Sequence, residues 1–260
     1  MEKKIKSKHP GKVLDKSRIL FGKHPVWAAV ESGRSLDRVY LQRGIEKSSY
    51  GRRLKSRLAR SGIPHTTVNK ETLERIAPGA NHQGVIALVG LKSYLTLDEL
   101  LEVVKRERAP FLLVLNKVQD PHNLGSLLRS AEGAGVNGII IPRHHACGLT
   151  PGAVRVASGA AEYISIARVT NIAKTLGRLE KEGYLLIGAA PEADLQYYEP
   201  EYHAPLTLVI GGEEKGLSPY ILGKLHRTVR IPMKGKITSL NTGVAGAIIM
   251  YEIRRQLDRD

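Results

Sequence analysis

Three loops in the second half of the chain hold polar side chains of types that can serve a reaction. The first loop, 116–125, contains Asn123 and leads into a segment that carries Arg129. The second, 211–219, has three glycines, which let a ligand approach the backbone closely. The third, 232–241, ends in Ser-Leu-Asn. These loops are the first candidates for a functional site.

Each loop also has an ordinary structural interpretation. Asn123 is a plausible N-cap for a helix over 124–134, and Arg129 could pair with a surface acid. The glycine loop could be a tight turn, and it is not a phosphate-cradling P-loop because no Gly-Lys-Ser/Thr follows it. The small residues of 242–247 permit close packing against a core, a ligand or a second subunit. No single loop therefore defines a chemistry.

Other reactive residues support fewer hypotheses. His144, His145 and Cys147 lack zinc-like spacing, so we predict no metal site. Ser239 has no identifiable His and acid partners, which argues against hydrolase chemistry. Cys147 is the only cysteine, which excludes an intramolecular disulfide and fits a reducing compartment.

The pattern of apolar runs predicts the element that positions the three loops. From residue 110 onward, runs typical of buried strands alternate with segments typical of helices. Such near-continuous apolar runs favour a parallel sheet covered on both faces. The predicted strands are 111–115, 138–141, 184–188, 206–210 and 229–231, and the predicted helices are 124–134, 172–182 and 241–257. Because all three loops follow strands, we expect them at the carboxyl edge of the sheet, where ligands bind.

The first part of the chain is organised differently. Residues 1–16 predict a mobile basic tail, and residues 17–91 predict a small α/β module. Residues 92–109 read as a linker with an amphipathic helix capped by Thr96. Residues 110–260 form the second domain. Within the small module we expect helices at 24–32 and 52–61 and strands at 38–41, 65–68 and 84–89.

Charge separates the two domains. The formal net charge is +15, and residues 1–70 hold 18 Lys/Arg against 5 Asp/Glu. A module this basic suits a polyanion such as nucleic acid, although a solvated basic face is the alternative. We expect no membrane span and no signal peptide, since no apolar run is long enough, and we therefore expect a cytoplasmic protein.

Taken together, the three loops resemble a known set of motifs. They match N-x(3)-D-P-x-N-x-G-x(3)-R-x-A at 116–131, G-x-E-x-x-G at 211–216 and I-P-M-x-G-x(3)-S-L-N at 231–241. This set is similar to that of the SpoU, or TrmH-like, branch of the SPOUT RNA 2′-O-ribose methyltransferases. Residues 21–26 and 81–85 resemble the L30e-like substrate-binding domain of bacterial 23S rRNA guanosine-2′-O-methyltransferases.

The resemblance implies an α/β fold with a C-terminal SPOUT domain, containing a parallel sheet and a deep trefoil knot, after a smaller N-terminal L30e-like α/β domain. It implies S-adenosylmethionine as cofactor, a homodimer through the knot region, and methylation of a guanosine ribose in 23S rRNA. The alternatives are a 2′-O-methyltransferase acting on tRNA or another rRNA nucleotide, and a non-catalytic ribosome-associated RNA-binding factor.

The resemblance also assigns roles to residues. The catalytic set is Arg129, Asn123, Glu213, Ser239 and Asn241; the cofactor contacts are Gly211, Ile231 and Leu240; the RNA contacts are Arg34, Arg38, Arg52, Arg53, Lys55 and Arg57. Arg129 either takes the hydroxyl proton or, still charged, binds RNA phosphate and stabilises the developing alkoxide. The chain departs from the family pattern at Gly243, where the family usually has a serine.

Overall fold

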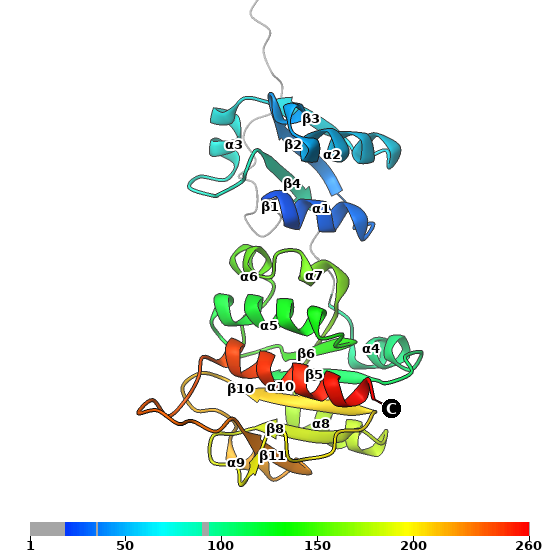
Figure 1. Ribbon diagram of the computed structural model, residues 1–260. Helices are drawn as coiled ribbons and strands as arrows, with labels where there is room; N and C mark the ends of the chain where they lie inside the picture. The colour runs from blue at the N-terminus through cyan, green and yellow to red at the C-terminus, as the bar shows by residue number, and fades with distance from the viewer. Residues whose placement is uncertain (1–18, 35, 90–93, 260) are drawn as a thin grey trace, which may run out of the picture. The chain divides into compact units, whose positions relative to one another are not determined.

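The computed structural model describes residues 19–34, 36–89 and 94–259, which divide into two compact units (Figure 1). The first unit comprises residues 1–23 and 35–91, and the second comprises residues 24–34 and 92–260. The predicted tail at 1–16 lies outside the described residues. Within the described ranges, no helix is long and apolar enough to cross a membrane.

The first unit is a four-stranded sheet with short helices. Its strands β1 (Ile19–Phe21), β2 (Leu36–Gln42), β3 (His65–Val68) and β4 (Val85–Val89) lie in the order β1-β4-β2-β3. β4 runs antiparallel to β1 and β2, while β2 and β3 are parallel. The helices are α2 (Ser49–Arg60) and α3 (Lys70–Ile76), with a 3₁₀ turn η2 (Ile45–Lys47). The expected strands at 38–41, 65–68 and 84–89 and the expected helix at 52–61 form here, while β1 and α3 were not predicted. The helix expected at 24–32 forms too, but it belongs to the second unit and not to this module.

The second unit is built on seven parallel strands. They are β5 (Phe111–Asn116), β6 (Gly138–Pro142), β7 (Ser165–Val169), β8 (Leu185–Ala189), β9 (Leu195–Gln196), β10 (Leu206–Gly211) and β11 (Arg227–Arg230). Their order is β7-β6-β5-β10-β8-β11-β9, and every pairing is parallel. The predicted parallel sheet is confirmed. β7 and β9 were not predicted, because β7 carries Arg168 and β9 is only two residues long.

Helices cover both faces of this sheet (Figure 1). Leu112 and Val114 of β5 point to the face covered by α4 (Leu97–Val104), α8 (Ile172–Lys181) and α9 (Pro219–Leu222). The opposite face carries α5 (Pro121–Gly133) and α10 (Thr242–Leu257), where Gly246 lies against Leu127 and Ile210. α6 (Pro151–Val156) and α7 (Ala160–Tyr163) pack on α5, and α1 (Lys23–Glu31) belongs to the unit from His24 onward.

The segment predicted as a linker takes part in this core. Thr96 and Glu99 form the predicted capping box at the start of α4. Leu100 and Val104 of that helix are buried against the sheet, and Leu95 pairs with Ala167 at its edge. In the capping box, the Thr96 backbone amide donates a hydrogen bond to the Glu99 carboxylate, and this bond lowers the pKa of Glu99 below its usual value.

The prediction that Asn123 caps the helix after β5 was wrong. The N-cap is Asp120, whose carboxylate accepts from the His122 amide at 2.9 Å, and Pro121 occupies the first turn. Proline suits that turn because its missing N–H has no partner there in any case. The helix therefore starts three residues earlier, and Asn123 lies inside it with a side chain free for other contacts.

The strand order and pairing do not test the predicted trefoil knot, which stays a prediction. The likeness of the first unit to L30e also stays a prediction.

Gly125 provides a test of the packing between α5 and α6. A Cβ at this position would lie 2.5 Å from Val156 Cβ and 2.6 Å from the Ala153 carbonyl oxygen. We expect Gly125→Ala to lower the free energy of unfolding by about 1–3 kcal/mol in urea denaturation, because backbone cannot yield easily. Gly177→Ala in α8 is the control: its Cβ meets nothing within 4 Å, and a gain of up to about 1 kcal/mol is expected. Equal effects of the two substitutions would contradict this packing.

Candidate functional site

The sheet register brings the first two motifs together. Asn116 ends β5 and pairs in register with Gly211, which ends β10. The loops that follow both strands therefore start side by side, although 95 positions separate these residues in the sequence. The third motif follows β11, two strands away in the same parallel sheet. All three motifs lie at the carboxyl edge, as predicted.

A chain of side-chain hydrogen bonds joins the three motifs. Asn123 Nδ2 donates to Glu213 Oε1 at 2.6 Å, and Asn241 Nδ2 donates to Asn123 Oδ1 at 2.8 Å. Asn241 Oδ1 then accepts from the backbone amides of Gly243 and Val244 at the start of α10. We call this chain, from Glu213 to the first turn of α10, the amide relay.

The chemistry of the groups determines the direction of the amide relay. An ionised carboxylate only accepts, so the Asn123 NH₂ must face Glu213 and its oxygen must face Asn241. A backbone N–H only donates, so the Asn241 oxygen must face α10. Asn123 is 6% exposed, which makes an unsatisfied amide there costly. One arrangement of both amides therefore satisfies the whole chain.

The glycines of the second motif permit close contacts between loop backbones. A Cβ at Gly212 would lie 2.3 Å from the Lys117 carbonyl oxygen in the first motif. A Cβ at Gly211 would lie 2.2 Å from the Gly216 carbonyl carbon. Gly216 itself has φ of 56°, in the left-handed region that favours glycine. The glycine loop is thus a tight turn that also packs against motif one.

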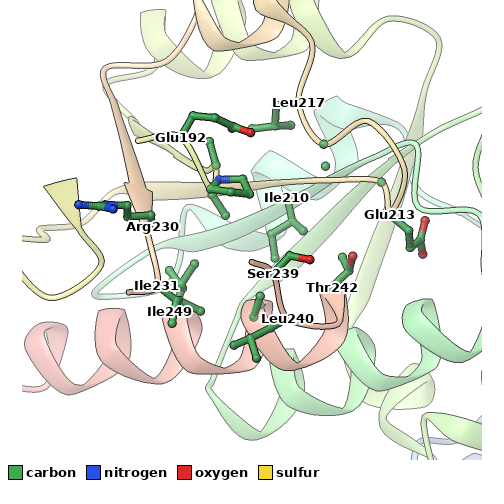
Figure 2. A pocket seen from close by; sticks show the side chains of 18 of the residues that line it. Glu192, Ile210, Glu213, Leu217, Arg230, Ile231, Ser239, Leu240, Thr242 and Ile249 are labelled. Carbon is green, nitrogen blue, oxygen red and sulfur yellow. The ribbon is translucent and has the colours of Figure 1, made fainter. Parts of the chain in front are cut away.

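A pocket of about 480 Å³ opens between these loops (Figure 2). It is lined by the carboxyl ends of β8, β10 and β11, by the loop 211–217, and by the third motif with the start of α10. Aliphatic side chains such as Ile210, Leu217 and Ile249 form much of the wall, with Glu192 and Glu213 as carboxylates. The volume lies within the range of about 300–1,000 Å³ that is common for small-molecule sites.

Most predicted site residues meet at this pocket. Gly211, Ile231, Leu240, Glu213 and Ser239 line it, and the amide relay connects Asn123 and Asn241 to Glu213. Arg129 is exposed on α5 and is not among the lining residues. Six residues of helix rotate its side chain by about 240° from that of Asn123.

Four charged residues that line the pocket were not predicted as site residues: Glu192, Glu214, Lys215 and Arg230. Glu192 follows the predicted strand 184–188, and Arg230 lies in the predicted strand 229–231. The rule that ligands bind at the carboxyl ends of parallel strands would have found the loop containing Glu192.

The departure at Gly243 has a structural explanation. A Cβ at this position would lie 2.9 Å from Ser126 Oγ and 3.0 Å from Ser126 Cβ, on the facing helix α5. Ser126 therefore occupies the space that a serine side chain at position 243 would need. The Gly243 backbone amide still donates to Asn241, so the cap of α10 is intact.

The remaining candidates for chemistry are outside the pocket. Burial raises the pKa of the Cys147 thiol, with the Asp120 and Glu213 carboxylates adding to the rise and a hydrogen bond with Thr150 opposing it. Among the described residues, no three His, Cys, Asp or Glu side chains gather into a group that could hold a metal.

The predicted RNA contacts differ in exposure. Arg38, Arg52 and Arg53 are exposed, while Lys55 and Arg57 are partly buried. The Arg34 side chain is 15% exposed and pairs with Glu162, 128 residues along the chain. Its guanidinium therefore has less surface for a phosphate than the arginines of α2. All six roles stay predictions.

Comparisons with known proteins place this geometry in a family. The family model described as SpoU rRNA methylase matches residues 110–251, and that described as RNA 2′-O ribose methyltransferase substrate binding matches residues 19–95. A Staphylococcus haemolyticus protein assigned to the TrmH family of tRNA/rRNA methyltransferases is 35% identical over 239 residues, covering 92% of this chain and 95% of that protein.

Two solved structures are informative. The SpoU methyltransferase AviRb from Streptomyces viridochromogenes, in complex with the cofactor AdoMet, has a TM-score of 0.76 and 26% identity, covering 92% of this chain and 89% of that one. The A. aeolicus TrmH/SpoU tRNA modifying enzyme has a TM-score of 0.53 and 27% identity, covering 62% of this chain and 82% of that one.

The parallel sheet and its edge pocket define an α/β RNA methyltransferase that uses S-adenosylmethionine. The chain belongs to the SpoU rRNA methylase family. The predicted fold class, enzyme class and cofactor are thereby confirmed.

The pocket residues fit this cofactor. S-adenosylmethionine supplies a methyl group on a positively charged sulfur, together with a flat adenine, a ribose and an amino acid portion. The aliphatic wall suits the adenine, and the carboxylates of Glu192 and Glu213 suit groups that are cationic or donate hydrogen bonds. A Cβ at Gly211 or Gly246 would meet neighbouring atoms at less than 3 Å. Because glycine has no Cβ, the walls of the pocket can lie close together.

Replacing Asn123 tests the amide relay. Asn123→Ala leaves the Asn241 NH₂ and one Glu213 oxygen without their partner, so we expect about 2 kcal/mol less stability to unfolding. Because Glu213 is then free to move, the dissociation constant for S-adenosylmethionine, measured by calorimetry, should rise roughly tenfold or more.

Asn171→Ala is the matched control. It removes the N-cap of α8, where the side chain accepts from the Lys174 amide at 3.0 Å, and should cost about 1 kcal/mol. Cofactor affinity should not change in this control. If Asn123→Ala weakens binding no more than Asn171→Ala does, the amide relay does not position Glu213 for the cofactor.

Proposed function

We propose that this enzyme transfers a methyl group from S-adenosylmethionine to the ribose 2′-hydroxyl of a guanosine in 23S rRNA. The amide relay carries the proposal, because it joins all three motifs at one pocket beside a carboxylate and the start of a helix. The match of residues 19–95 to a 2′-O-ribose methyltransferase substrate-binding family supports the ribose as acceptor.

The family match favours rRNA over tRNA as the substrate. Residues 110–251 match the model described as SpoU rRNA methylase, whereas the A. aeolicus tRNA modifying enzyme covers 62% of this chain. The arginines on α2 of the first unit suit phosphate contacts. tRNA, or another rRNA nucleotide, is the alternative substrate.

The reaction makes two demands on the protein. Displacement at the methyl group is in line, so the acceptor oxygen must be held opposite the sulfur. The ribose hydroxyl is a weak nucleophile, so its proton must be removed or strongly polarised. The leaving thioether is neutral and needs no acid.

Chain residues meet these demands in distinct ways. Glu213, oriented by Asn123, and Ser239 line the pocket and orient the reactants there. Arg129 is exposed and forms no ion pair among the described residues, so its guanidinium is available for RNA. We assign it to the phosphate beside the target ribose, where its charge also stabilises the developing alkoxide.

We further propose a homodimer through the third-motif region. Val244, Ile248 and Tyr251 follow one another at helical spacing along α10, and Val244 and Tyr251 are 48% and 53% exposed. Exposed apolar side chains in a row favour a protein contact. Arg129 flanks this row, because α5 packs on α10 with Ser126 near Gly243 and Gly133 near Tyr251.

We also propose a cytoplasmic location, where rRNA is available and a lone cysteine stays reduced.

The activity can be tested directly. Purified protein, S-adenosylmethionine and unmodified 23S rRNA transcript should yield 2′-O-methylguanosine, detected by mass spectrometry of nucleosides after digestion. Arg129→Ala should lower kcat by about 10²–10³-fold with cofactor affinity unchanged. Arg129→Lys keeps the charge but loses the bidentate geometry, so its kcat should lie between that of the wild type and that of Arg129→Ala.

Methylation of tRNA transcript but not of 23S rRNA would reject the proposed substrate. Cofactor binding without methylation of any RNA would favour a non-catalytic RNA-binding factor. Full activity in Arg129→Ala would reject the role assigned to this arginine.

The dimer has a separate test. Tyr251→Arg places a charge in the exposed apolar row of α10, and light scattering should then report half the wild-type mass. Tyr220→Arg changes another exposed tyrosine of the same unit, at 68% exposure on α9, and should leave the mass at the wild-type value. A wild-type monomer would refute the dimer.

A further inference from the structure

The sheet edge beside the pocket carries two unpaired cationic side chains and two histidines. Lys117 follows β5, and Arg143, His144 and His145 follow β6. All four side chains are exposed, and none forms an ion pair within the described part of the chain. Residues 133–161, which include this second loop, contain no Asp or Glu.

This concentration is local. Residues 110–260 contain 17 Lys/Arg and 14 Asp/Glu, so this part of the chain is close to neutral. Residues 133–161 contain two Lys/Arg and no acid, so the loop after β6 is positively charged. The one acid of the loop after β5 is Asp120, whose carboxylate caps α5.

The two cationic loops are fixed to one another and to the sheet. The Cys147 amide donates to the Val118 carbonyl at 2.8 Å, which joins the loop after β6 to the loop after β5. The Leu149 amide donates to the Tyr94 hydroxyl at 2.7 Å. The Arg168 guanidinium lies 4.6 Å from the Tyr94 ring centroid and donates to the Arg143 carbonyl at 3.3 Å.

The backbone is strained at two of these residues. Lys117 has φ of 65° and His145 has φ of 56°, a region that non-glycine residues rarely adopt. These are two of the three such residues in the described part of the second unit. Left-handed backbone costs about 1–3 kcal/mol at such positions and persists where surrounding contacts impose it, often at functional sites.

The loops adjoin the methyl-transfer pocket. The pocket lies at the ends of β8, β10 and β11, and the cations lie at the ends of the next strands, β5 and β6. The Lys117 carbonyl packs against Gly212, which lines the pocket. Pocket and cations thus form one continuous edge within the second unit.

We propose that Lys117 and Arg143, with His144 and His145, form an RNA-binding surface that holds the phosphates of the strand flanking the methylated nucleotide. This surface rests on the proposed function, because an RNA strand whose ribose enters the pocket must continue past its walls. It is separate from the basic first unit. Its contacts are to backbone phosphate, so it positions the strand without reading its sequence.

The decisive variant is Lys117→Asn/Arg143→Gln, in the full chain. Asparagine removes the charge and tolerates left-handed backbone better than most residues, so the loop should keep its fold. We expect the dissociation constant for 23S rRNA transcript to rise about tenfold. The slope of log K against log salt should fall by roughly 1.4–1.8, at about 0.7–0.9 per phosphate contact. The dissociation constant for S-adenosylmethionine should not change.

Lys181→Gln/Lys224→Gln is the matched control. Both lysines are exposed in the same unit, but they precede β8 and β11 and so lie at the opposite edge of the sheet. RNA affinity and salt slope should stay at wild-type values. If the two double variants behave alike, the surface proposal is overturned.

Cross-linking gives a second readout that a structural role would not produce. Wild-type protein is irradiated with 4-thiouridine-substituted 23S rRNA transcript and digested with trypsin. The peptide 144–155, released by cleavage after Arg143 and Arg155, should carry nucleotides. Cross-links confined to peptides of the first unit would overturn the proposal.

Methylation measured in the same samples separates the two hypotheses. If RNA cross-links to the peptide 144–155 but is not methylated, the proposed surface is supported and the proposed function is rejected. If both double variants bind and methylate RNA as the wild type does, the proposed function is supported and the proposed surface is rejected.

Discussion

A carboxylate can accept hydrogen bonds but cannot donate them, and the second unit is organised around that property at Glu213. Its acceptance from Asn123 determines the orientation of that amide, and Asn123 in turn determines the orientation of Asn241. The last acceptor in the relay holds the first amides of α10. Three segments that are remote in the sequence thus share one satisfied polar network, and the pocket exists where they meet. The residues of this network cannot be substituted independently, since the loss of one side chain leaves the next without a hydrogen-bond partner.

The glycines around this network keep the loops close together. Gly212 permits contact with the Lys117 carbonyl, and Gly246 permits α10 to approach Leu127 and Ile210. The same close packing explains why position 243 lacks a side chain, because Ser126 of the facing helix fills that volume. A family position can therefore lose its serine while the cap it belongs to is retained.

Positive charge is divided between two places with different tasks. The first unit carries most of the net charge, with exposed arginines on α2 suited to gripping a large RNA. The second unit is nearly neutral, and its Lys117 and Arg143 lie in the loops after β5 and β6, next to the pocket. In the proposed function, the first surface would supply affinity and the second would hold the strand so that the ribose lies in line with the methyl group.

The sequence by itself determined the parallel sheet, because β5, β6 and β10 are apolar on both faces and such runs pair only inside a covered sheet. It also determined which loops meet at the carboxyl edge, because strands of one direction end on one side. Local patterns failed where partners are distant. Asn123 looked like a cap, because its side-chain partners Glu213 and Asn241 lie 90 and 118 residues away. The ion pair of Arg34 with Glu162 was not predicted either, because 128 residues separate the two. Only the tertiary structure decided these pairings, the pocket residue Glu192 and the position of Arg129 outside the pocket, because each depends on which surfaces pack together and not on the spacing of residues along the chain.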